Sequence, residues 1–300
     1  MGERDLEMLG AEDRSRHKAR RGLAIFFAIV VPLSAIFEVL IITTGDFSWL
    51  IPLVWVPALA SVVTRLVLRE GFSDVSFRLG GRRGWSAIVL ALVFPIVVGL
   101  IVYGIAWMTT LARFAPRSDL AGDGASPLTA FVVILAASTT IGTIALALTA
   151  AGEEIGWRGY MLTRLIDAGV PRPVLVSGLL WGLWHVAGTL TGVYATGPSP
   201  VLSAVLLIVT LVSLSYVIGR MRLQTGSIWP AIAVHAAWNS IIVGAFDSAT
   251  TGAGAALWVG ESGILTALTL VVATVLFSRG HWTIRRQPGA QRDSSTSSPA

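Results

Sequence analysis

Polar residues with catalytic potential occur in pairs, spaced four apart, within long apolar stretches of the chain. Side chains four residues apart lie on the same face of a helix. Each pair can therefore point into one cavity if its stretch is helical. The pairs are Glu154 and Arg158 in EEIGWRGY, Trp181 and His185 in WGLWH, and His235 and Asn239 in HAAWN, and Glu153 directly precedes the first of them.

Water activation is the chemistry that these residue types favour. Glu153 can take a proton from water while the oxygen attacks a carbonyl group. A histidine N–H and the Asn239 amide can then donate hydrogen bonds to the oxyanion that forms. The same groups could instead bind a divalent metal such as zinc, which would acidify the water directly. The candidate ligands for that metal are Glu153, Glu154, His185 and His235.

The composition is typical of a membrane protein. Hydrophobic residues make up 54% of the 300 residues and charged residues only 13%, about half of the ~25% usual in soluble domains. The absence of cysteine excludes disulfides, thiolate nucleophiles and cysteine-ligated metals. Although the net charge is +5, the arginines lie in short loops and form no basic face, so we expect no nucleic-acid partner.

Eight apolar stretches are long enough to cross a membrane, which takes ~20 residues as a helix. The expected fold is an all-α, polytopic bundle of about eight transmembrane helices around a polar cavity within the membrane. We expect a polar N-terminal segment at 1–21, a transmembrane domain at 22–278 and a disordered tail at 279–300. The expected spans are 22–44, 49–68, 85–109, 128–152, 173–190, 200–218, 228–246 and 259–278.

The distribution of basic residues predicts the orientation in the membrane. With eight spans, both termini lie on the same side. All of the 22 Lys and Arg residues except Arg113 and Arg117 fall on that side, and basic residues mark the cytoplasmic side. We therefore expect an integral, multi-pass protein of the plasma membrane with both termini in the cytoplasm.

The polar segments are expected at a similar depth in the bilayer. At 1.5 Å per residue, Glu153, His185 and His235 lie roughly 21, 18 and 12 Å from the cytoplasmic ends of their helices. Each of these residues alone can be explained by a structural role. Glu154 and Arg158, for example, can neutralise each other. That pairing leaves Glu153 without a partner. Together they favour function, because ionisable groups inside membranes are rarely incidental.

Other residues in the apolar stretches have simpler interpretations. Gly178 and Gly182 form a GxxxG pattern, which favours close packing between helices. Glu38 and Arg65 also fall in or near apolar spans, and the sequence assigns neither of them a role. The chain lacks HExxH, the helical zinc motif of metalloproteases.

The polar segments resemble the motifs of the CPBP family, also called the Abi family, which includes type II CAAX prenyl endopeptidases and bacteriocin-processing or immunity proteins. EEIGWRGY resembles its EExxxR motif, and HAAWN resembles its HxxxN motif. WGLWH resembles the FxxxH motif with Trp181 in place of phenylalanine. All three occur in the family's order, within roughly residues 125–250.

The resemblance implies a hydrolase, an intramembrane endopeptidase of the glutamate or the metal-dependent type. We favour the glutamate type, with no required cofactor, because two histidines on separate helices make a sparse zinc site. The implied roles are water activation for Glu153 and His185, oxyanion stabilisation for His235 and Asn239, and support of the site for Glu154 and Arg158.

The expected partners are membrane lipids and a membrane-associated peptide or protein substrate, lipid-modified if the resemblance to CAAX proteases extends that far. Two alternatives stay open. A catalytically silent immunity or scaffold protein of the same family would carry the motifs without cleaving a peptide. A proton-coupled transporter would use buried Glu, Arg and His as a relay. The sequence does not set the identity of the substrate, its prenylation, the metal dependence or the oligomeric state.

Overall fold

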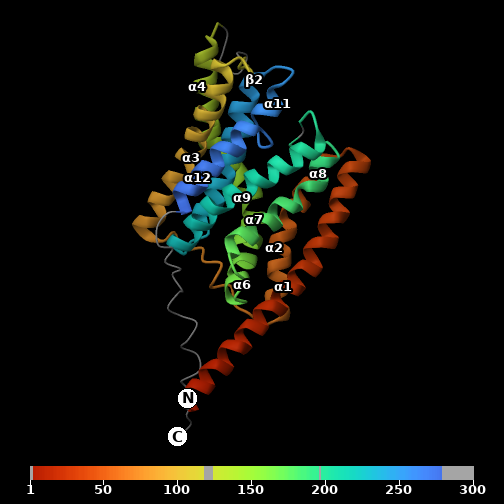
Figure 1. Cartoon of the computed structure of the whole chain (residues 1–300), viewed down its shortest axis with the longest axis vertical. Helices are drawn as coiled ribbons and strands as arrows, with labels where there is room; N and C mark the ends of the chain where they lie inside the picture. The colour runs from red at the N-terminus through yellow and green to blue at the C-terminus, as the bar shows by residue number, and fades with distance from the viewer. Residues whose placement is uncertain (1–2, 118–123, 196, 279–300) are drawn as a thin grey trace.

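Long apolar helices make up nearly all of the structure, a computed structural model that describes residues 3–117, 124–195 and 197–278 (Figure 1). The tail expected at 279–300 lies outside the described residues. The α-helices are α1 (Glu3–Thr44), α2 (Leu50–Val67), α3 (Gly81–Met108), α4 (Pro127–Ala137), α5 (Thr143–Gly156), α6 (Leu162–Asp167), α7 (Pro173–Trp184), α8 (Val186–Leu190), α9 (Pro200–Thr225), α10 (Trp229–Trp238), α11 (Ala255–Trp258) and α12 (Ile264–Ser278).

Short irregular elements interrupt or join these helices. Two short strands form an antiparallel pair in which Arg113 faces Thr251, at the end of the bundle away from the start of α1 (Figure 1). The 3₁₀ turns are η1 (Phe47–Trp49) and η6 (Asp247–Ala249), the π-helical segments are η3 (Ser138–Gly142), η4 (Trp157–Met161) and η5 (Asn239–Phe246), and the strands are β1 (Arg113–Phe114) and β2 (Thr250–Thr251).

The described residues include six helices that are long and apolar enough to cross a membrane. Two of the eight expected spans are shorter apolar helices, Pro173–Trp184 and Ile264–Ser278. The all-α, polytopic fold is confirmed, although these two spans differ in length from the prediction. The six long helices are Glu12–Thr44, Phe47–Val67, Gly81–Met108, Pro127–Asp167, Pro200–Thr225 and Trp229–Ala249.

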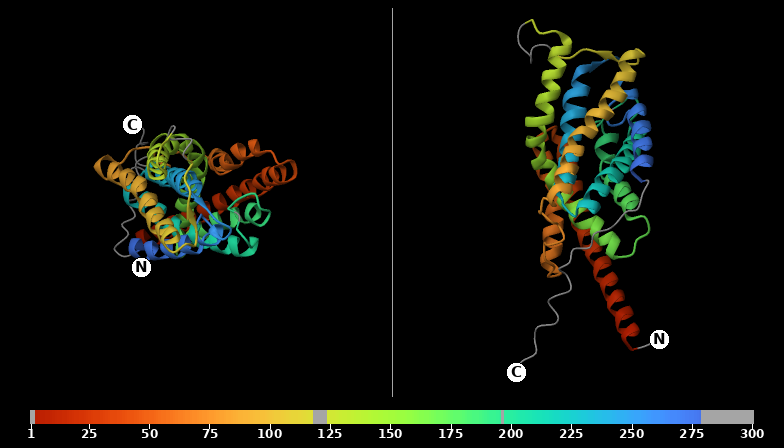
Figure 2. Two further views of the ribbon diagram at one scale, coloured as in Figure 1. Left: turned by 90° about the horizontal axis from the view of Figure 1, so that it is seen from above. Right: turned by 90° about the vertical axis from the view of Figure 1, so that its left-hand side faces the viewer.

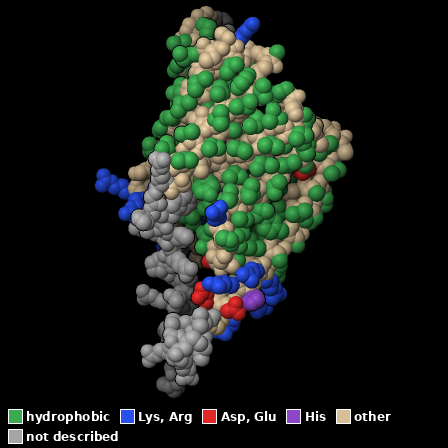
Figure 3. Space-filling view, viewed as in Figure 1, with side chains coloured by type: hydrophobic (Ala, Val, Ile, Leu, Met, Phe, Trp, Pro, Cys, Tyr) green, Lys and Arg blue, Asp and Glu red, His purple; other side chains and the backbone are tan. Residues whose placement is uncertain are grey.

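The surface of the bundle is apolar over its middle. Figure 3 shows hydrophobic side chains covering this region, with charged side chains gathered mainly at the end where α1 begins. Branched aliphatic residues such as Ile144 and Leu148 are largely exposed there. Soluble monomers rarely expose apolar patches of this extent, so the surface is that of an integral membrane protein. Helix α1 lies against α2 on the outside of the bundle, and its first turns project beyond the other helices (Figure 2).

The span expected at 173–190 is broken at His185. Its side-chain Nδ1 lies 2.9 Å from the Trp181 carbonyl oxygen, which in a regular helix would accept the backbone N–H of residue 185. That N–H instead bonds to the Gly182 carbonyl. The imidazole has therefore replaced a backbone donor, and α7 ends at Trp184 while α8 restarts at Val186.

Glycines allow the helices that carry the motifs to pack closely on their neighbours. A Cβ atom on Gly152 would lie 2.6 Å from the Val54 carbonyl oxygen, and one on Gly156 would lie 2.3 Å from Pro57 Cβ. These contacts hold α5 directly against α2. The GxxxG pattern of α7 does the same against α9, since a Cβ on Gly178 would meet a backbone carbon at 2.9 Å.

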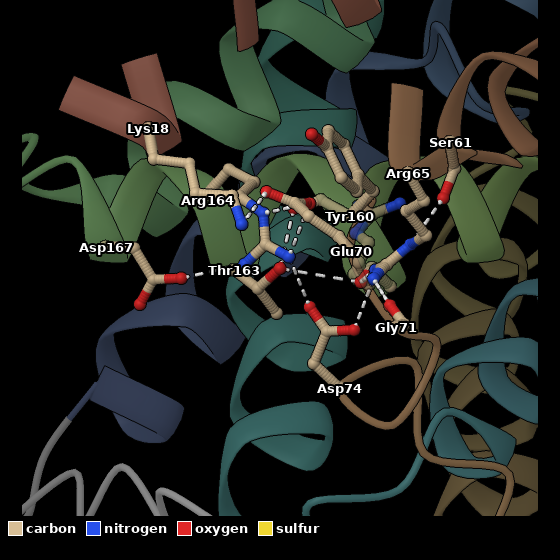
Figure 4. Close-up of polar contacts among 12 residues, drawn as sticks. Lys18, Ser61, Arg65, Glu70, Gly71, Asp74, Tyr160, Thr163, Arg164 and Asp167 are labelled. Carbon is tan, nitrogen blue, oxygen red and sulfur yellow. Dashed lines mark hydrogen bonds and ion pairs between the residues drawn. The ribbon is translucent and has the colours of Figure 1, made fainter. Parts of the chain in front are cut away.

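A buried arginine joins α2 to the helix that carries the EExxxR motif. Arg65 has no exposed surface. Its guanidinium donates to Asp74 Oδ1 at 2.5 Å, to the Gly71 carbonyl at 2.6 Å and to the Gly159 carbonyl of η4 at 3.0 Å (Figure 4). Arg65, to which the sequence assigned no role, is therefore a structural residue that anchors the loop after α2 to η4.

A second arginine extends this network at the same end of the bundle. Arg164 of α6 donates to Glu70 Oε2 at 3.0 Å, to Asp74 Oδ2 at 2.9 Å and to Asp167 Oδ2 at 2.9 Å (Figure 4). Arg222 of α9 donates to the Asp74 carbonyl and, at 3.3 Å, to the Arg158 carbonyl. Asp74 thus lies at the centre of a charged cluster that joins α2, α6 and α9.

The Arg65 network predicts a large loss of stability when Arg65 is replaced by methionine. The substitution leaves two backbone carbonyls and Oδ1 of Asp74 without this donor, while Arg164 still pairs with Oδ2 of Asp74. Losing several hydrogen bonds from one charged donor costs about 2 kcal/mol or more. Denaturation of the purified protein in detergent measures the change. The exposed Arg83→Met variant is the control, and an equal loss in both variants would contradict the prediction.

Candidate active site

Three helices bring motif side chains to the wall of one cavity of ≈ 260 Å³. Glu153 comes from α5, His185 from the break between α7 and α8, and His235 from α10. Asn239, the first residue of η5, lines the same cavity. We expected Glu153, His185 and His235 at similar depths, and these three residues line the same cavity together with Asn239.

Glu154 contributes to the site from a position without any exposed surface. Its Oε1 accepts hydrogen bonds from Arg158 Nη1 at 2.7 Å and from His235 Nδ1 at 2.8 Å. Arg158 also donates to Ser215 Oγ at 2.8 Å, and its Cζ lies 4.2 Å from the centre of the Trp181 ring, a cation–π contact. One carboxylate oxygen therefore joins η4 to α10.

The contact with Glu154 sets the hydrogen positions on His235. An ionised carboxylate only accepts, so Nδ1 of His235 carries a hydrogen. Its Nε2 lies 4.0 Å from Glu153 Oε1, which is too long for a direct hydrogen bond. Both atoms therefore keep their capacity to bond a third group at the cavity wall.

Glu153 is held by Trp181, which the sequence placed on the same helix face as His185 without giving it a catalytic role. Only 5% of Glu153 is exposed, and its Oε2 accepts a hydrogen bond from the Trp181 indole N–H at 2.8 Å. Because this contact uses Oε2, Oε1 is the oxygen that faces His235. The carboxylate therefore has one oxygen fixed and the other available for chemistry.

The bond that breaks α7 also sets the tautomer of His185. A carbonyl oxygen can only accept, so Nδ1 donates to the Trp181 carbonyl and carries the hydrogen. In the neutral ring Nε2 then holds the lone pair. The Trp184 and Tyr194 rings lie 4.8 and 5.1 Å from the imidazole, centre to centre. His185 thus has a fixed orientation and one free acceptor.

A second, larger cavity of ≈ 570 Å³ adjoins the first. The two cavities share Leu146, Val193, Tyr194, Asn239 and Glu261. The second is bounded by β2, α11 and the loop before α12, at the end of the bundle away from the start of α1 (Figure 1). Asn239 therefore stands where both cavities meet.

The first cavity has an apolar wall formed by the start of the chain. It is lined there by α1, η1 and α2, and several of the lining side chains are also exposed on the apolar surface: Ile42, Phe47, Leu50 and Ile51. Glu38, which the sequence left without a role, is half-buried in the same wall. Apart from Glu38, the side chains between the site and the exposed apolar surface on this side are hydrophobic.

Glu261 is a buried carboxylate at the shared wall that sequence reasoning missed. Its two oxygens accept hydrogen bonds from the Tyr194 hydroxyl and, at 2.9 Å, from the Trp238 indole N–H. Burial and the charge of Glu261 raise the pKa of Tyr194 well above its usual value, so the phenol stays a donor. Glu261 could have been identified from the sequence, because it is an acidic residue inside the apolar stretch 259–278.

Glu261 also belongs to the segment GESG, residues 260–263, which has the GxSG spacing of intramembrane serine proteases. A serine nucleophile needs a base within hydrogen-bond reach. Ser262 Oγ is buried, and within the part of the chain that the structure describes it has no hydrogen-bond partner. The geometry therefore does not supply the base that a serine mechanism requires.

The motif residues do not converge as metal ligands. A protein zinc site takes at least three ligands around one point. Within residues 3–117, 124–195 and 197–278, no three His, Cys, Asp or Glu side chains are close enough to hold a metal ion. The hydrogen bonds of the two histidines use Nδ1 and leave Nε2 of both rings available. The described side chains therefore form no three-ligand group, and the metal-dependent alternative is left to the chelator experiment below.

Comparison with known protein families agrees with the motif resemblance. Residues 130–241 match the family described as type II CAAX prenyl endopeptidase Rce1-like. The matched segment contains all six motif residues and ends before Glu261. A comparison with curated proteins found no match. The expected resemblance to CAAX proteases is therefore confirmed: over residues 130–241 the chain is similar to the Rce1-like family of type II CAAX prenyl endopeptidases.

Proposed function

We propose that the chain is an intramembrane endopeptidase in which Glu153 and His185 activate a water molecule. The observation that carries the proposal is the meeting of Glu153, His185, His235 and Asn239 at one cavity inside an apolar bundle. A carboxylate, two imidazoles and an amide are the groups that amide hydrolysis needs. The family match supports the same reaction class.

Proton transfer in this reaction follows from the hydrogen positions. Nε2 of His185 accepts one hydrogen of the water, and Oε1 of Glu153 takes the other as a proton when the oxygen attacks the carbonyl carbon. The C–N bond of the resulting tetrahedral intermediate then breaks. The proton passes from Glu153 to the leaving nitrogen, so the carboxylate is regenerated with each turnover.

The oxyanion of the intermediate needs donors that are already oriented. The Asn239 amide supplies one. Nε2 of His235 supplies the other when the ring carries a hydrogen on both nitrogens, since Nδ1 already donates to Glu154. The carboxylate of Glu154 lies 2.8 Å from Nδ1 of that ring and balances its charge while Glu153 holds the proton taken from water. Glu154 and Arg158 thus support the site without touching the substrate.

The substrate in this proposal is a membrane-associated peptide or protein with an apolar part. The wall formed by α1, η1 and α2 is apolar and borders the lipid-facing surface, which suits a hydrophobic segment or an attached lipid. We infer from the distribution of Lys and Arg that both termini lie in the cytoplasm. The second cavity then lies toward the opposite side of the membrane.

Replacing Glu153 with glutamine should reduce kcat/KM about 1000-fold while the fold is retained, because the variant lacks the base. Cleavage of quenched fluorescent peptides, prenylated and unprenylated, measures this in detergent. The exposed Glu12→Gln variant is the matched control, and Ser262→Ala tests the serine motif. Each variant is assayed with and without a metal chelator.

Three results would contradict the glutamate mechanism. Full activity of Glu153→Gln would leave that residue structural. Loss of activity with chelator, restored by zinc, would establish a metalloprotease. Loss in Ser262→Ala alone would establish a serine protease. Absence of cleavage by the wild type across the library would favour the silent family member, and proton-coupled flux in vesicles would favour a transporter.

The Glu154→Gln variant should lose both activity and stability. Neutralising Glu154 leaves the buried guanidinium of Arg158 without its counter-charge, which costs about 3 kcal/mol. Denaturation in detergent should separate this variant from Glu153→Gln, which removes no ion-pair partner of an arginine. Equal stability of the two variants would show that Glu154 is not the supporting carboxylate.

Single cysteines can test the orientation, because the chain has no native cysteine. Thr251 and Ser15 are both exposed and lie at opposite ends of the bundle. We expect a membrane-impermeant maleimide to label Thr251→Cys in intact cells, and Ser15→Cys only after permeabilisation. The reverse pattern would place both termini outside the cytoplasm.

A further inference from the structure

Trp181 contacts four residues to which the proposed mechanism gives a role: Glu153, His185, His235 and Arg158. Only 1% of the residue is exposed. Its indole N–H donates to Glu153, and its carbonyl accepts from the His185 imidazole. The ring lies 5.2 Å from the His235 ring, edge to face, and 4.2 Å from the Arg158 guanidinium.

The hydrogen bond from the indole N–H orients the carboxylate of Glu153. The contacts of the Trp181 ring with His235 and Arg158 do not. A carboxylate on a flexible side chain can rotate about its last torsion, which exchanges its two oxygens. The 2.8 Å bond from Trp181 Nε1 selects Oε2 as the fixed oxygen. Oε1 is thereby directed toward His235 Nε2 and the cavity.

We infer that Trp181 is a positioning residue that fixes Glu153 for catalysis through its indole N–H. This inference rests on the proposed function of Glu153 as the base. The FxxxH motif that WGLWH resembles has phenylalanine at this place, and phenylalanine has no donor. The chain therefore adds a contact that the aromatic ring of the motif cannot make.

Phenylalanine at position 181 gives a clean test, because it keeps an aromatic ring and the backbone carbonyl and removes only the N–H with part of the ring. A hydrogen bond to a charged group is strong enough that its loss corresponds to about tenfold in rate. We expect kcat of Trp181→Phe to fall about tenfold with KM within about twofold of the wild type, the pattern of an interaction that matters in the transition state.

Trp229→Phe is the matched kinetic control. The Trp229 indole also donates a hydrogen bond, to the Phe77 carbonyl at 2.7 Å, but at the other end of the bundle and outside both cavities. This variant should keep wild-type kinetics. Wild-type kcat in Trp181→Phe, or a change confined to KM, would overturn the positioning role.

A spectroscopic measurement decides the same question without any substrate. The full chain labelled with ¹⁵N-tryptophan has at most one indole N–H signal for each of its 11 tryptophans, and the signal lost in Trp181→Phe identifies residue 181. A proton bonded to a carboxylate is deshielded, so Glu153→Ala should move this signal upfield. The exposed Glu12→Ala variant should leave it in place.

The two measurements separate failure of the inference from failure of the proposed function. If the wild type cleaves no peptide but Glu153→Ala moves the Trp181 signal, Trp181 holds Glu153 and the proposed function is wrong. If Glu153→Ala leaves the signal unchanged, the indole does not hold Glu153, and the inference is overturned whatever the activity.

Discussion

A carboxylate with no exposed surface imposes the constraint on which the site depends. Burying the charge of Glu154 is costly unless donors surround it. Oε1 of Glu154 has two donors from different parts of the chain, Arg158 one turn further along and His235 from α10. The requirement to satisfy one buried oxygen therefore fixes how α5 and η4 lie against α10, and with them the distance between Glu153 and His235.

The support continues away from the cavity through main-chain carbonyls. A π-helical turn such as η4 departs from regular helical hydrogen bonding, and its carbonyl groups need other donors when buried. Arg222 donates to the carbonyl of Arg158, and Arg65 to that of Gly159. Both arginines also bond to Asp74, so the charged cluster of Figure 4 holds the turn from which Arg158 reaches Glu154.

Much of this arrangement follows from local sequence rules, and the rest does not. Apolar length predicts the helices, and a spacing of four predicts that Glu154 meets Arg158, because both depend on helix geometry alone. The break at His185 is different. It depends on a side chain displacing a backbone donor, a competition that the apolar pattern of 173–190 does not reveal. The π-helical start at Asn239 is equally invisible to hydrophobic periodicity.

The contacts of Glu261 and Arg65 were unpredictable for another reason. Each joins segments far apart in sequence: Glu261 meets Tyr194 from the loop after α8, and Arg65 meets the carbonyl of Gly159. A buried ionisable residue can be recognised from its apolar neighbours, but its partner depends on which helices pack together. Sequence reasoning noted Arg65 without a role and missed Glu261, and it could not indicate the partners of either residue.

The irregular segments lie where the proposed chemistry needs them. Regular helices use their own N–H and C=O groups internally, so they present only side chains spaced along one face. His185 lies at a helix break and Asn239 at the start of a π-helical segment, and both line the cavity. Two cavities of different character meet at Asn239, one with an apolar wall and one bounded by loops. Under the proposed function, a substrate that is hydrophobic on one side of its scissile bond and polar on the other matches this division, with Glu153 and His185 on the apolar side of the junction.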